Sequence, residues 1–235
     1  MIVIAEIGLN HNGNIQLARC LIEEAAAAGA DVAKFQFFDI SKYFGPDFEW
    51  YDACMKARLD FEQAAAVKAH CDAVGIEFCA SAFDVEGVEW CERLGVKRHK
   101  LASRCIRQHE VIQAMAETGK PMIVSLGMWT HKEFPQIEAK GAVHFLHCIA
   151  KYPTEPDDVR FHSVDFRRYA GFSDHTIGTT AAKIAIARGA QIVEKHFTLS
   201  KRMYGPDHHG SAEPHELLEI VEFARNARPY IDNES

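Results

Sequence analysis

The sequence predicts a (β/α)8 barrel, in which eight parallel strands alternate with helices and close into a ring. Three observations favour this fold. Short apolar runs alternate with helix-like runs along the 235 residues. The apolar runs seldom alternate with polar residues, as expected for parallel strands covered by helices. Eight strand–helix units can be counted, and residues 1–235 are therefore expected to form a single catalytic barrel domain.

The first four units are marked by apolar runs followed by helix-like segments. Strands are expected at residues 2–6, 31–36, 77–83 and 98–103. Helices are expected at residues 14–29, 60–75, 85–94 and 107–118. The first of these helices carries a stripe of alanines and ends at Gly29. An aromatic-rich loop at 37–51 follows the second strand, and it is equally compatible with a lid and with a packed loop.

The last four units repeat this plan with weaker helices. Strands are expected at residues 121–127, 143–148, 170–174 and 191–197. Helical structure is expected as a short helix near 131–139, a weak turn at 161–168, and clear helices at 176–188 and 214–228. The structural rival is a doubly wound open sheet, whose first turn usually carries GxGxxG. The first strand is instead followed by GLNHNG, which lacks those spaced glycines and favours the barrel.

Composition argues against several functional classes. The net charge of −7 and the pI near 6.0 argue against non-specific nucleic-acid binding. No run approaches the ~20 apolar residues of a membrane span, and the opening MIVIAEIG lacks the features of a signal peptide. The seven cysteines include no CxxC pair, and most, such as Cys20, Cys79 and Cys148, lie in apolar contexts. We therefore expect buried thiols, a cytoplasmic location, and no nucleic-acid or membrane partner.

Polar side chains end or follow every predicted strand, where barrel enzymes carry their active sites. Buried unpaired charges cost several kcal/mol, so these residues need partners or a ligand. Together with Gly127, which also ends the fifth strand, the set comprises Glu6, Asn10, His11, Lys34, Gln36, Ser81, Asp84, Lys100, Ser103, Arg104, Ser125, His147, Tyr152, Ser173, Asp174, His175, Glu194, Lys195 and His196.

One half of this set suits an anion. Lys34 and Lys100 are joined by hydroxyl groups, and together they are expected to form a cationic, hydroxyl-rich wall that binds a phosphate or a carboxylate. The serines of this wall are Ser81, Ser103, Ser125 and Ser173.

The other half suits a metal. His175 and His196 lie 21 residues apart and end neighbouring predicted strands. The first strand closes the ring beside the eighth, which brings Glu6 near them, and Asp207 adds a second carboxylate. Two imidazoles with nearby carboxylates are expected to hold a divalent ion with open positions. A phosphorylated acid reacting with a carbonyl compound is the chemistry that these two halves suggest.

The motifs around these residues resemble one known family. AEIGLNHNG, KFQ, KLAS, SLGM, LHC with YPT, GFSDHT, VEKHFT and GPDHHGSAEP follow in the order seen in sialic acid synthases, also called N-acylneuraminate synthases. The match extends over nearly the whole chain, up to Glu213. The resemblance implies a barrel enzyme that condenses phosphoenolpyruvate with an N-acylated sugar aldehyde. It also implies a divalent metal, with Mn²⁺ favoured over Mg²⁺ and Co²⁺.

The resemblance also implies roles for individual residues. His175 and His196 would be the metal ligands, and Glu6 would place or activate the attacking water. The acceptor sugar would face Gln36, Tyr152 and Asp207. Phosphoenolpyruvate would be held by Lys34, Ser81, Lys100, Ser103, Ser125 and Ser173.

Three departures from the family concern the acceptor. Family members usually continue into an antifreeze-like domain that supplies an arginine to the partner subunit's substrate, whereas this sequence ends at Ser235. After KLAS the family usually has Gly-Glu, with the Glu on the sugar, whereas this chain has Arg104 and Cys105. Ala150 replaces a sugar-contacting Asn. We expect the same donor with a different, smaller or anionic acceptor, whose carboxylate or phosphate would pair with Arg104.

Other assemblies and functions stay open at this stage. A homodimer built through barrel helices and a separately encoded antifreeze-like subunit are both compatible with the sequence. One rival function is a 2-keto acid aldolase, either metal-dependent or using Lys34 or Lys100 as a Schiff base, and the number of phosphate-type ligands argues against it. A non-catalytic regulatory paralogue is the second rival. The presence of Glu6, both histidines and both lysines argues against that role.

Overall fold

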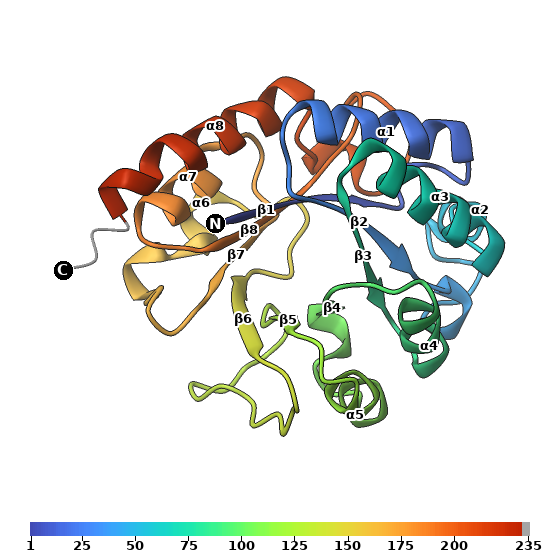
Figure 1. Cartoon of the computed structure of the whole chain (residues 1–235), viewed down its shortest axis with the longest axis horizontal. Helices are drawn as coiled ribbons and strands as arrows, with labels where there is room; N and C mark the ends of the chain where they lie inside the picture. Colours follow the sequence, from blue (N-terminus) through green and yellow to red (C-terminus); the bar gives the residue numbers. More distant parts are fainter. Residues whose placement is uncertain (232–235) are drawn as a thin grey trace.

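Eight parallel strands form a closed barrel in the computed structural model, which describes residues 1–231 (Figure 1). Each strand pairs with the next one in the sequence, and the last pairs with the first, so the ring has no free edge. The predicted (β/α)8 fold is confirmed, and each predicted strand agrees with the observed one to within two residues at either end. The strands are β1 (Ile2–Gly8), β2 (Val32–Phe37), β3 (Glu77–Ala82), β4 (His99–Leu101), β5 (Met122–Ser125), β6 (Val143–Cys148), β7 (Gly171–Asp174) and β8 (Ile192–His196).

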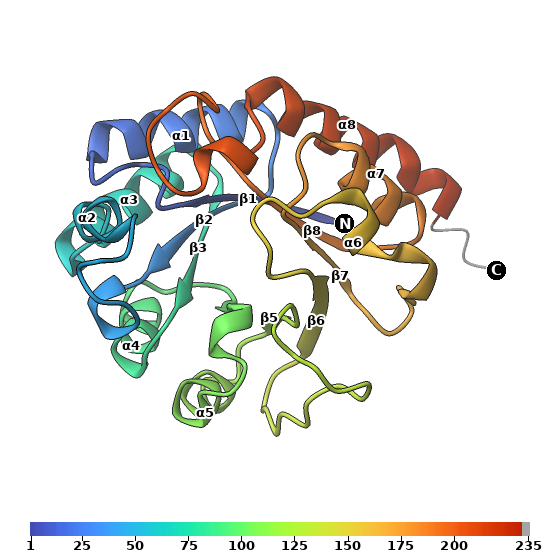
Figure 2. The same cartoon turned by 180° about the vertical axis from the view of Figure 1, so that it is seen from behind.

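Helices cover most of the outside of the barrel (Figures 1 and 2). The α-helices are α1 (Ile15–Ala27), α2 (Tyr51–Lys56), α3 (Phe61–Val74), α4 (Val85–Arg93), α5 (His109–Glu117), α6 (Pro156–Val159), α7 (Thr180–Ala187) and α8 (Pro214–Ile231). Short 3-10 turns are η1 (Ile40–Lys42), η2 (Ser103–Cys105), η3 (Phe161–Ser163) and η4 (His208–Gly210). Side-chain hydrogen bonds cap the N-termini of two helices. Asn14 accepts hydrogen bonds at the start of α1, and Asp60 forms a capping box with Gln63 at the start of α3.

The helix predicted at 131–139 is wrong, because these residues form a loop between β5 and β6 (Figure 1). Pro135 lacks the N–H that a helix needs there. Phe134 instead packs against Phe145 and Tyr169, with both ring-centroid distances 4.8 Å. The loop therefore packs against β6 through Phe134 and Phe145. The predicted turn at 161–168 is shorter than expected, since only η3 is helical there.

Alternate residues of each strand face the barrel interior, and this arrangement fixes the depth of the site. The deepest layer is apolar and consists of Ile4, Val32, Cys79, Ile123, Leu146 and Ile192. Two residues further along the same strands, a second buried layer consists of Glu6, Lys34, Ser81, Ser125, Cys148 and Glu194. The intervening residues, such as Val3, Ala5 and Ile7 of β1, pack in the main core between the strands and the helices. The first polar layer of the barrel interior therefore lies two residues along the strands from the apolar layer.

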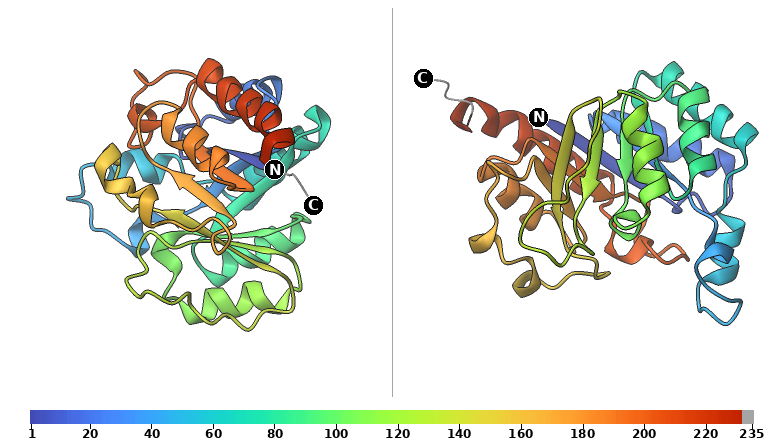
Figure 3. Two further views of the ribbon diagram at one scale, coloured as in Figure 1. Left: turned by 90° about the vertical axis from the view of Figure 1, so that its left-hand side faces the viewer. Right: turned by 90° about the horizontal axis from the view of Figure 1, so that it is seen from below.

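Two long loops project from the carboxyl end of the barrel. Residues 38–50 follow β2 and residues 198–213 follow β8, and both lie at the same end in the right-hand view of Figure 3. They touch through Trp50 and Tyr204, whose ring centroids lie 5.3 Å apart. Asn10 fastens the second loop by donating to the Phe197 carbonyl and to Ser211 Oγ, both at 2.9 Å. The two loops are therefore joined to each other beyond the carboxyl ends of the strands.

The cysteines are all free thiols, and six of the seven are buried. Cys20 is the exception to the prediction of buried thiols, because it lies on the exposed side of α1. None of the helices within residues 1–231 combines the length and apolarity that a bilayer crossing requires.

β7 and β8 approach each other so closely at Gly171 that no side chain fits there. A Cβ atom at this position would lie 1.8 Å from the carbonyl oxygen of Ile192, so Gly171→Ala forces the two strands apart. We expect the free energy of unfolding to fall by about 3 kcal/mol or more, as measured by urea denaturation. Gly210→Ala is the matched control, because a Cβ atom at that position would have no heavy atom within 4 Å. Equal stability of the two variants would contradict this explanation.

Candidate active site

A cavity of about 470 Å³ opens at the carboxyl ends of the strands. All thirteen residues that the sequence assigned to donor, acceptor or metal line it, so the fold brings them together. Their roles as ligands stay predictions. They are Glu6, Lys34, Gln36, Ser81, Lys100, Ser103, Arg104, Ser125, Tyr152, Ser173, His175, His196 and Asp207.

Several other polar residues at strand ends serve the fold instead. Asp84 caps α4 through the Gly87 N–H and forms an ion pair with Lys42. His147 hydrogen-bonds the Val159 carbonyl at 3.1 Å and stacks on Phe172. Asn10 and His11 are buried in the loop after β1, and Asp174 and Lys195 point away from the cavity toward each other.

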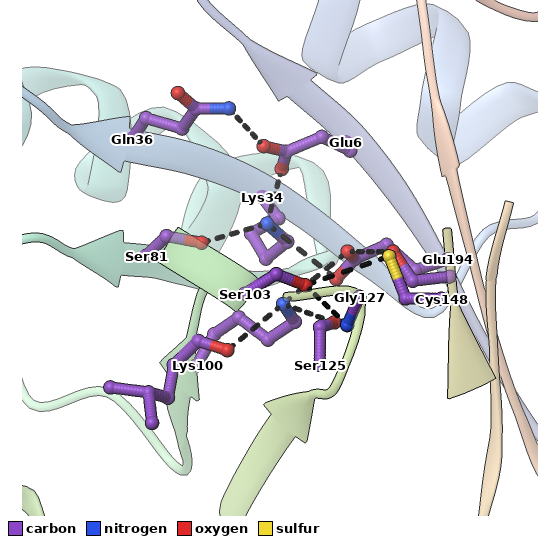
Figure 4. A network of polar contacts seen from close by, with 12 residues as sticks. Glu6, Lys34, Gln36, Ser81, Lys100, Ser103, Ser125, Gly127, Cys148 and Glu194 are labelled. Atoms are coloured by element: carbon purple, nitrogen blue, oxygen red, sulfur yellow. Dashed lines mark hydrogen bonds and ion pairs between the residues drawn. The ribbon is translucent and has the colours of Figure 1, made fainter. Parts of the chain in front are cut away.

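Lys34 joins two carboxylates at the floor of the cavity (Figure 4). Its Nζ lies 2.7 Å from Glu6 Oε2 and 3.5 Å from Glu194 Oε2, and it donates to Ser81 Oγ at 2.9 Å. Gln36 completes the surroundings of Glu6 by donating from Nε2 to Oε1 at 2.7 Å. All of these contacts come from β1, β2, β3 and β8, which are neighbours in the ring.

Lys100 repeats the arrangement on the other side of Glu194 (Figure 4). Lys100 Nζ lies 3.5 Å from Glu194 Oε1 and donates to Ser125 Oγ at 2.9 Å. Ser173 donates to the same Glu194 oxygen at 2.9 Å. Two lysines, two carboxylates and three serines therefore form one connected network, and the expected cationic wall is partly neutralised from within.

Burial and these ion pairs shift the pKa values of the network in different directions. Burial alone would lower the pKa of Lys34, but Glu194 and Glu6 outweigh it and raise that pKa. Burial opposes ionisation of Glu194, yet Lys100 and Lys34 lower its pKa to about 2. Burial raises the pKa of Glu6, and the attraction of Lys34 only partly offsets it. Glu6 is therefore the more basic carboxylate, and Lys34 is held protonated.

Glu194, which the sequence placed at a strand end without a role, and Cys148, which it did not place at the site, both line the cavity. Cys148 Sγ accepts from Ser103 Oγ at 3.6 Å and lies 3.9 Å from His175 Nδ1. The Gly127 N–H holds Ser103 in turn, at 3.0 Å. Strand periodicity was the available signal, because Glu194 lies two residues before His196 and so faces the same way.

His175 and His196 meet at the side of the cavity formed by β7 and β8. Their ring centroids lie 5.6 Å apart, and the exposed ring of Tyr152 covers His175 at 4.0 Å. His175 Nδ1 lies 2.7 Å from the Ile149 carbonyl, so this nitrogen carries a proton. Burial alone would lower the pKa of His175, but Cys148 and this carbonyl outweigh it and raise that pKa. Burial lowers the pKa of His196 to about 4, and its Nδ1 lies 3.9 Å from Asp207 Oδ2.

This donor set fits a divalent metal with open positions. His196 Nδ1 is buried without a hydrogen-bond partner among the described residues, and the Nδ1 contact of His175 with the Ile149 carbonyl leaves its Nε2 as the nitrogen available to an ion. No cluster of three or more His, Cys, Asp or Glu side chains in residues 1–231 is arranged to hold an ion. The carboxylate of Glu6 is occupied by Lys34 and Gln36. Two imidazoles would therefore share any ion with water or substrate.

An ion pair behind the barrel wall fixes the two strand ends that carry these histidines. Lys195 Nζ lies 3.0 Å from Asp174 Oδ2, and both side chains are fully buried. Lys195 also donates to the Thr176 carbonyl, while Asp174 accepts from the Thr176 N–H at 2.8 Å. Each partner immediately precedes a histidine in the sequence, so the pair sets the relative position of the two imidazoles.

Comparison with known proteins identifies the family. A model of the NeuB family matches residues 21–235. The chain belongs to the NeuB family. It is 34% identical over 243 residues to the N,N'-diacetyllegionaminic acid synthase of Campylobacter jejuni, covering 92% of this chain and 73% of that protein. It is 32% identical over 247 residues to the N-acetylneuraminate-9-phosphate synthase of Homo sapiens, covering 95% and 69%.

A solved structure shows the same fold. The crystal structure of N-acetylneuraminic acid (sialic acid) synthetase from Leptospira borgpetersenii superposes with a TM-score of 0.92 at 31% identity, covering 100% of this chain and 86% of that one. The resemblance inferred from the strand-end motifs is thereby confirmed.

Breaking the buried Asp174–Lys195 pair should destabilise the barrel strongly. Lys195→Met leaves Asp174 charged and buried without its partner, and we expect the free energy of unfolding to fall by about 3–5 kcal/mol. The matched control is Lys183→Met, whose pair with Glu219 is partly exposed, and it should cost less than about 1 kcal/mol. Urea denaturation of both variants makes the comparison. Similar losses would show that the buried pair has no special weight.

Buried neutral histidines should make stability depend on pH below neutrality. Burial lowers the pKa of His208 to about 4, whereas in the unfolded chain it is near 6.5. Between these values only the unfolded state binds the proton, so the free energy of unfolding should fall as pH falls from about 6.5 toward 4. Denaturation at several pH values should give a shallower dependence for His208→Asn than for the exposed control His162→Asn. If the free energy of unfolding depended on pH equally in both variants, the lowered pKa of His208 would be refuted.

Proposed function

We propose that this chain is a sialic acid synthase-like enzyme that condenses phosphoenolpyruvate with a sugar aldehyde. The products would be a 3-deoxy-2-keto sugar acid and inorganic phosphate. The observation that carries the proposal is the single cavity in which the Lys34–Lys100 network adjoins the two neighbouring imidazoles of His175 and His196. An anion-binding network beside carbonyl-activating groups is what such a condensation requires.

The donor would bind at the floor of the cavity. Lys34 and Lys100 supply positive charge, and the buried serines supply hydroxyl donors for phosphate and carboxylate oxygens. Because Glu194 already bridges the lysines at 3.5 Å, the network stays neutral enough to remain buried before substrate enters. The serines are Ser81, Ser103, Ser125 and Ser173.

The reaction is a carbon–carbon bond formation followed by hydration. C3 of phosphoenolpyruvate attacks the aldehyde carbon, and the carbonyl electron pair moves to its oxygen, which takes a proton. Water then adds to C2 and loses one proton, which leaves a hydroxyl on C2. The C2–O bond to phosphate breaks, the hydroxyl proton leaves with the phosphate, and C2 becomes a ketone. Glu6 would place the water and accept its proton, because its carboxylate lines the cavity between Lys34 and Gln36.

The acceptor would bind at the histidine side of the cavity. His175 and His196 would hold the divalent ion, for which Mn²⁺ is the first candidate. Such an ion, when bound, supplies Lewis-acid polarisation of the aldehyde. Tyr152 covers His175, and Asp207 and Gln36 line the space beside it. The names of the relatives differ in their sugar products, since one product is a 9-phosphate and another is not, so the acceptor is a separate question.

A Schiff-base aldolase fits this site less well. Its lysine must lose a proton to attack a carbonyl. Lys34 is held protonated by Glu6 and Glu194, and its raised pKa opposes that step. Borohydride treatment with pyruvate should therefore leave the protein unmodified by mass spectrometry.

Phosphate release tests the proposed reaction. Wild-type protein with phosphoenolpyruvate and Mn²⁺ should release phosphate in the presence of N-acetylmannosamine or another aldose. His196→Ala should lower kcat/KM by more than about 100-fold, because it removes one of the two imidazoles. His162→Ala, an exposed histidine outside the cavity, should behave as wild type.

Two outcomes would overturn the proposal. Release that is equal in wild type and His196→Ala would separate the activity from this site. Silence across a panel of aldoses and sugar phosphates, with phosphoenolpyruvate still bound tightly in calorimetry, would favour a regulatory protein.

A further inference from the structure

Arg104 is the one cation of the cavity wall, among the residues that the structure describes, without a carboxylate at ion-pair distance. Lys34 and Lys100 are the other lysine or arginine residues there, and Glu6 and Glu194 neutralise them. Arg104 is exposed to the cavity mouth, whereas both lysines are buried. An unpaired guanidinium facing a substrate cavity is available to an anion that enters from solvent.

Aromatic rings hold this guanidinium in place. Arg104 lies in η2, directly after β4, with its Cζ atom 5.1 Å from the ring centroid of Phe44 and 5.8 Å from that of Tyr43. Tyr43 is itself fixed, because its hydroxyl donates to the Phe83 carbonyl at 2.8 Å. Stacking against ring faces leaves the N–H groups at the guanidinium edge free, and that edge matches the two oxygens of a carboxylate or phosphate.

The position of Arg104 in the ring separates it from both the donor and the metal side. β4 lies four strands from β8 in the closed eight-strand barrel, so η2 faces His196 across the mouth. The donor network lies between them but deeper, since Lys100 and Ser125 are buried. A molecule whose aldehyde reaches the two histidines therefore extends over the donor toward Arg104.

We propose that the acceptor carries an anionic group, a phosphate or a carboxylate, at the end remote from its aldehyde, and that Arg104 binds this group. The inference rests on the proposed function and assigns the substrate class to the same site. It makes Arg104 the residue that selects charged over neutral acceptors.

Steady-state phosphate release with three related acceptors tests this selection. The probes are N-acetylmannosamine, its 6-phosphate and the corresponding uronic acid, so that the two charged arms distinguish phosphate from carboxylate. Wild type should favour one charged acceptor in kcat/KM. Arg104→Gln should lower the ratio of charged to neutral kcat/KM by about 10–100-fold, the usual weight of a charged hydrogen bond. The loss should lie in KM for the charged acceptor, and Arg104→Lys should restore part of it.

The matched control is Arg107→Gln, an exposed arginine three residues later that does not line the cavity. It should keep the wild-type preference. Equal use of charged and neutral acceptors by wild type would overturn the inference, and so would an Arg104→Gln effect confined to KM for phosphoenolpyruvate.

Failure of the proposed function gives a different result. If no acceptor supports phosphate release, calorimetry of the same three probes in the presence of phosphoenolpyruvate still tests Arg104. Tighter binding of a charged probe that Arg104→Gln abolishes would support the assignment without turnover. Equal binding of charged and neutral probes would refute it.

Discussion

The bridge that Glu194 makes between Lys34 and Lys100 is the interaction on which the site depends. Two lysines buried side by side would repel each other and lose hydration, and neither cost is tolerable without a nearby negative charge. Glu194 lies 3.5 Å from each of them, and Glu6 adds a closer contact to Lys34. Because the partners come from β1, β2, β4 and β8, the charges are balanced only once the ring has closed.

This dependence explains which parts of the site the sequence could predict. Strand periodicity places Lys34, Ser81 and Ser125 on the interior face of the barrel. Because the strands are parallel, residues near their carboxyl ends lie at the same end of the barrel. Thirteen assigned residues accordingly line one cavity. Their pairing is not a local property: Glu194 reaches Lys100 across the ring, and nothing near either residue in the sequence specifies that contact.

The errors have similarly local explanations. A helix was predicted at 131–139, but Pro135 removes a backbone hydrogen-bond donor there, and Phe134 packs against Phe145 of β6. Cys20 lies among apolar neighbours in the sequence yet faces outward on α1. In both cases tertiary packing determined the observed structure, and contacts between residues distant in the sequence cannot be read from the local pattern.

The depth ordering of the barrel interior has a consequence for how such a protein can change. The groups assigned to the donor lie mostly within strands, where the neighbouring strands constrain each side chain. Arg104 and Ala150 lie beyond the strand ends, where replacing a side chain disturbs little of the ring. Mutation can therefore change the side chains around the cavity mouth while the buried network stays as it is. A single-residue insertion inside a strand would instead turn that strand's part of the buried network outward and break the network in one step.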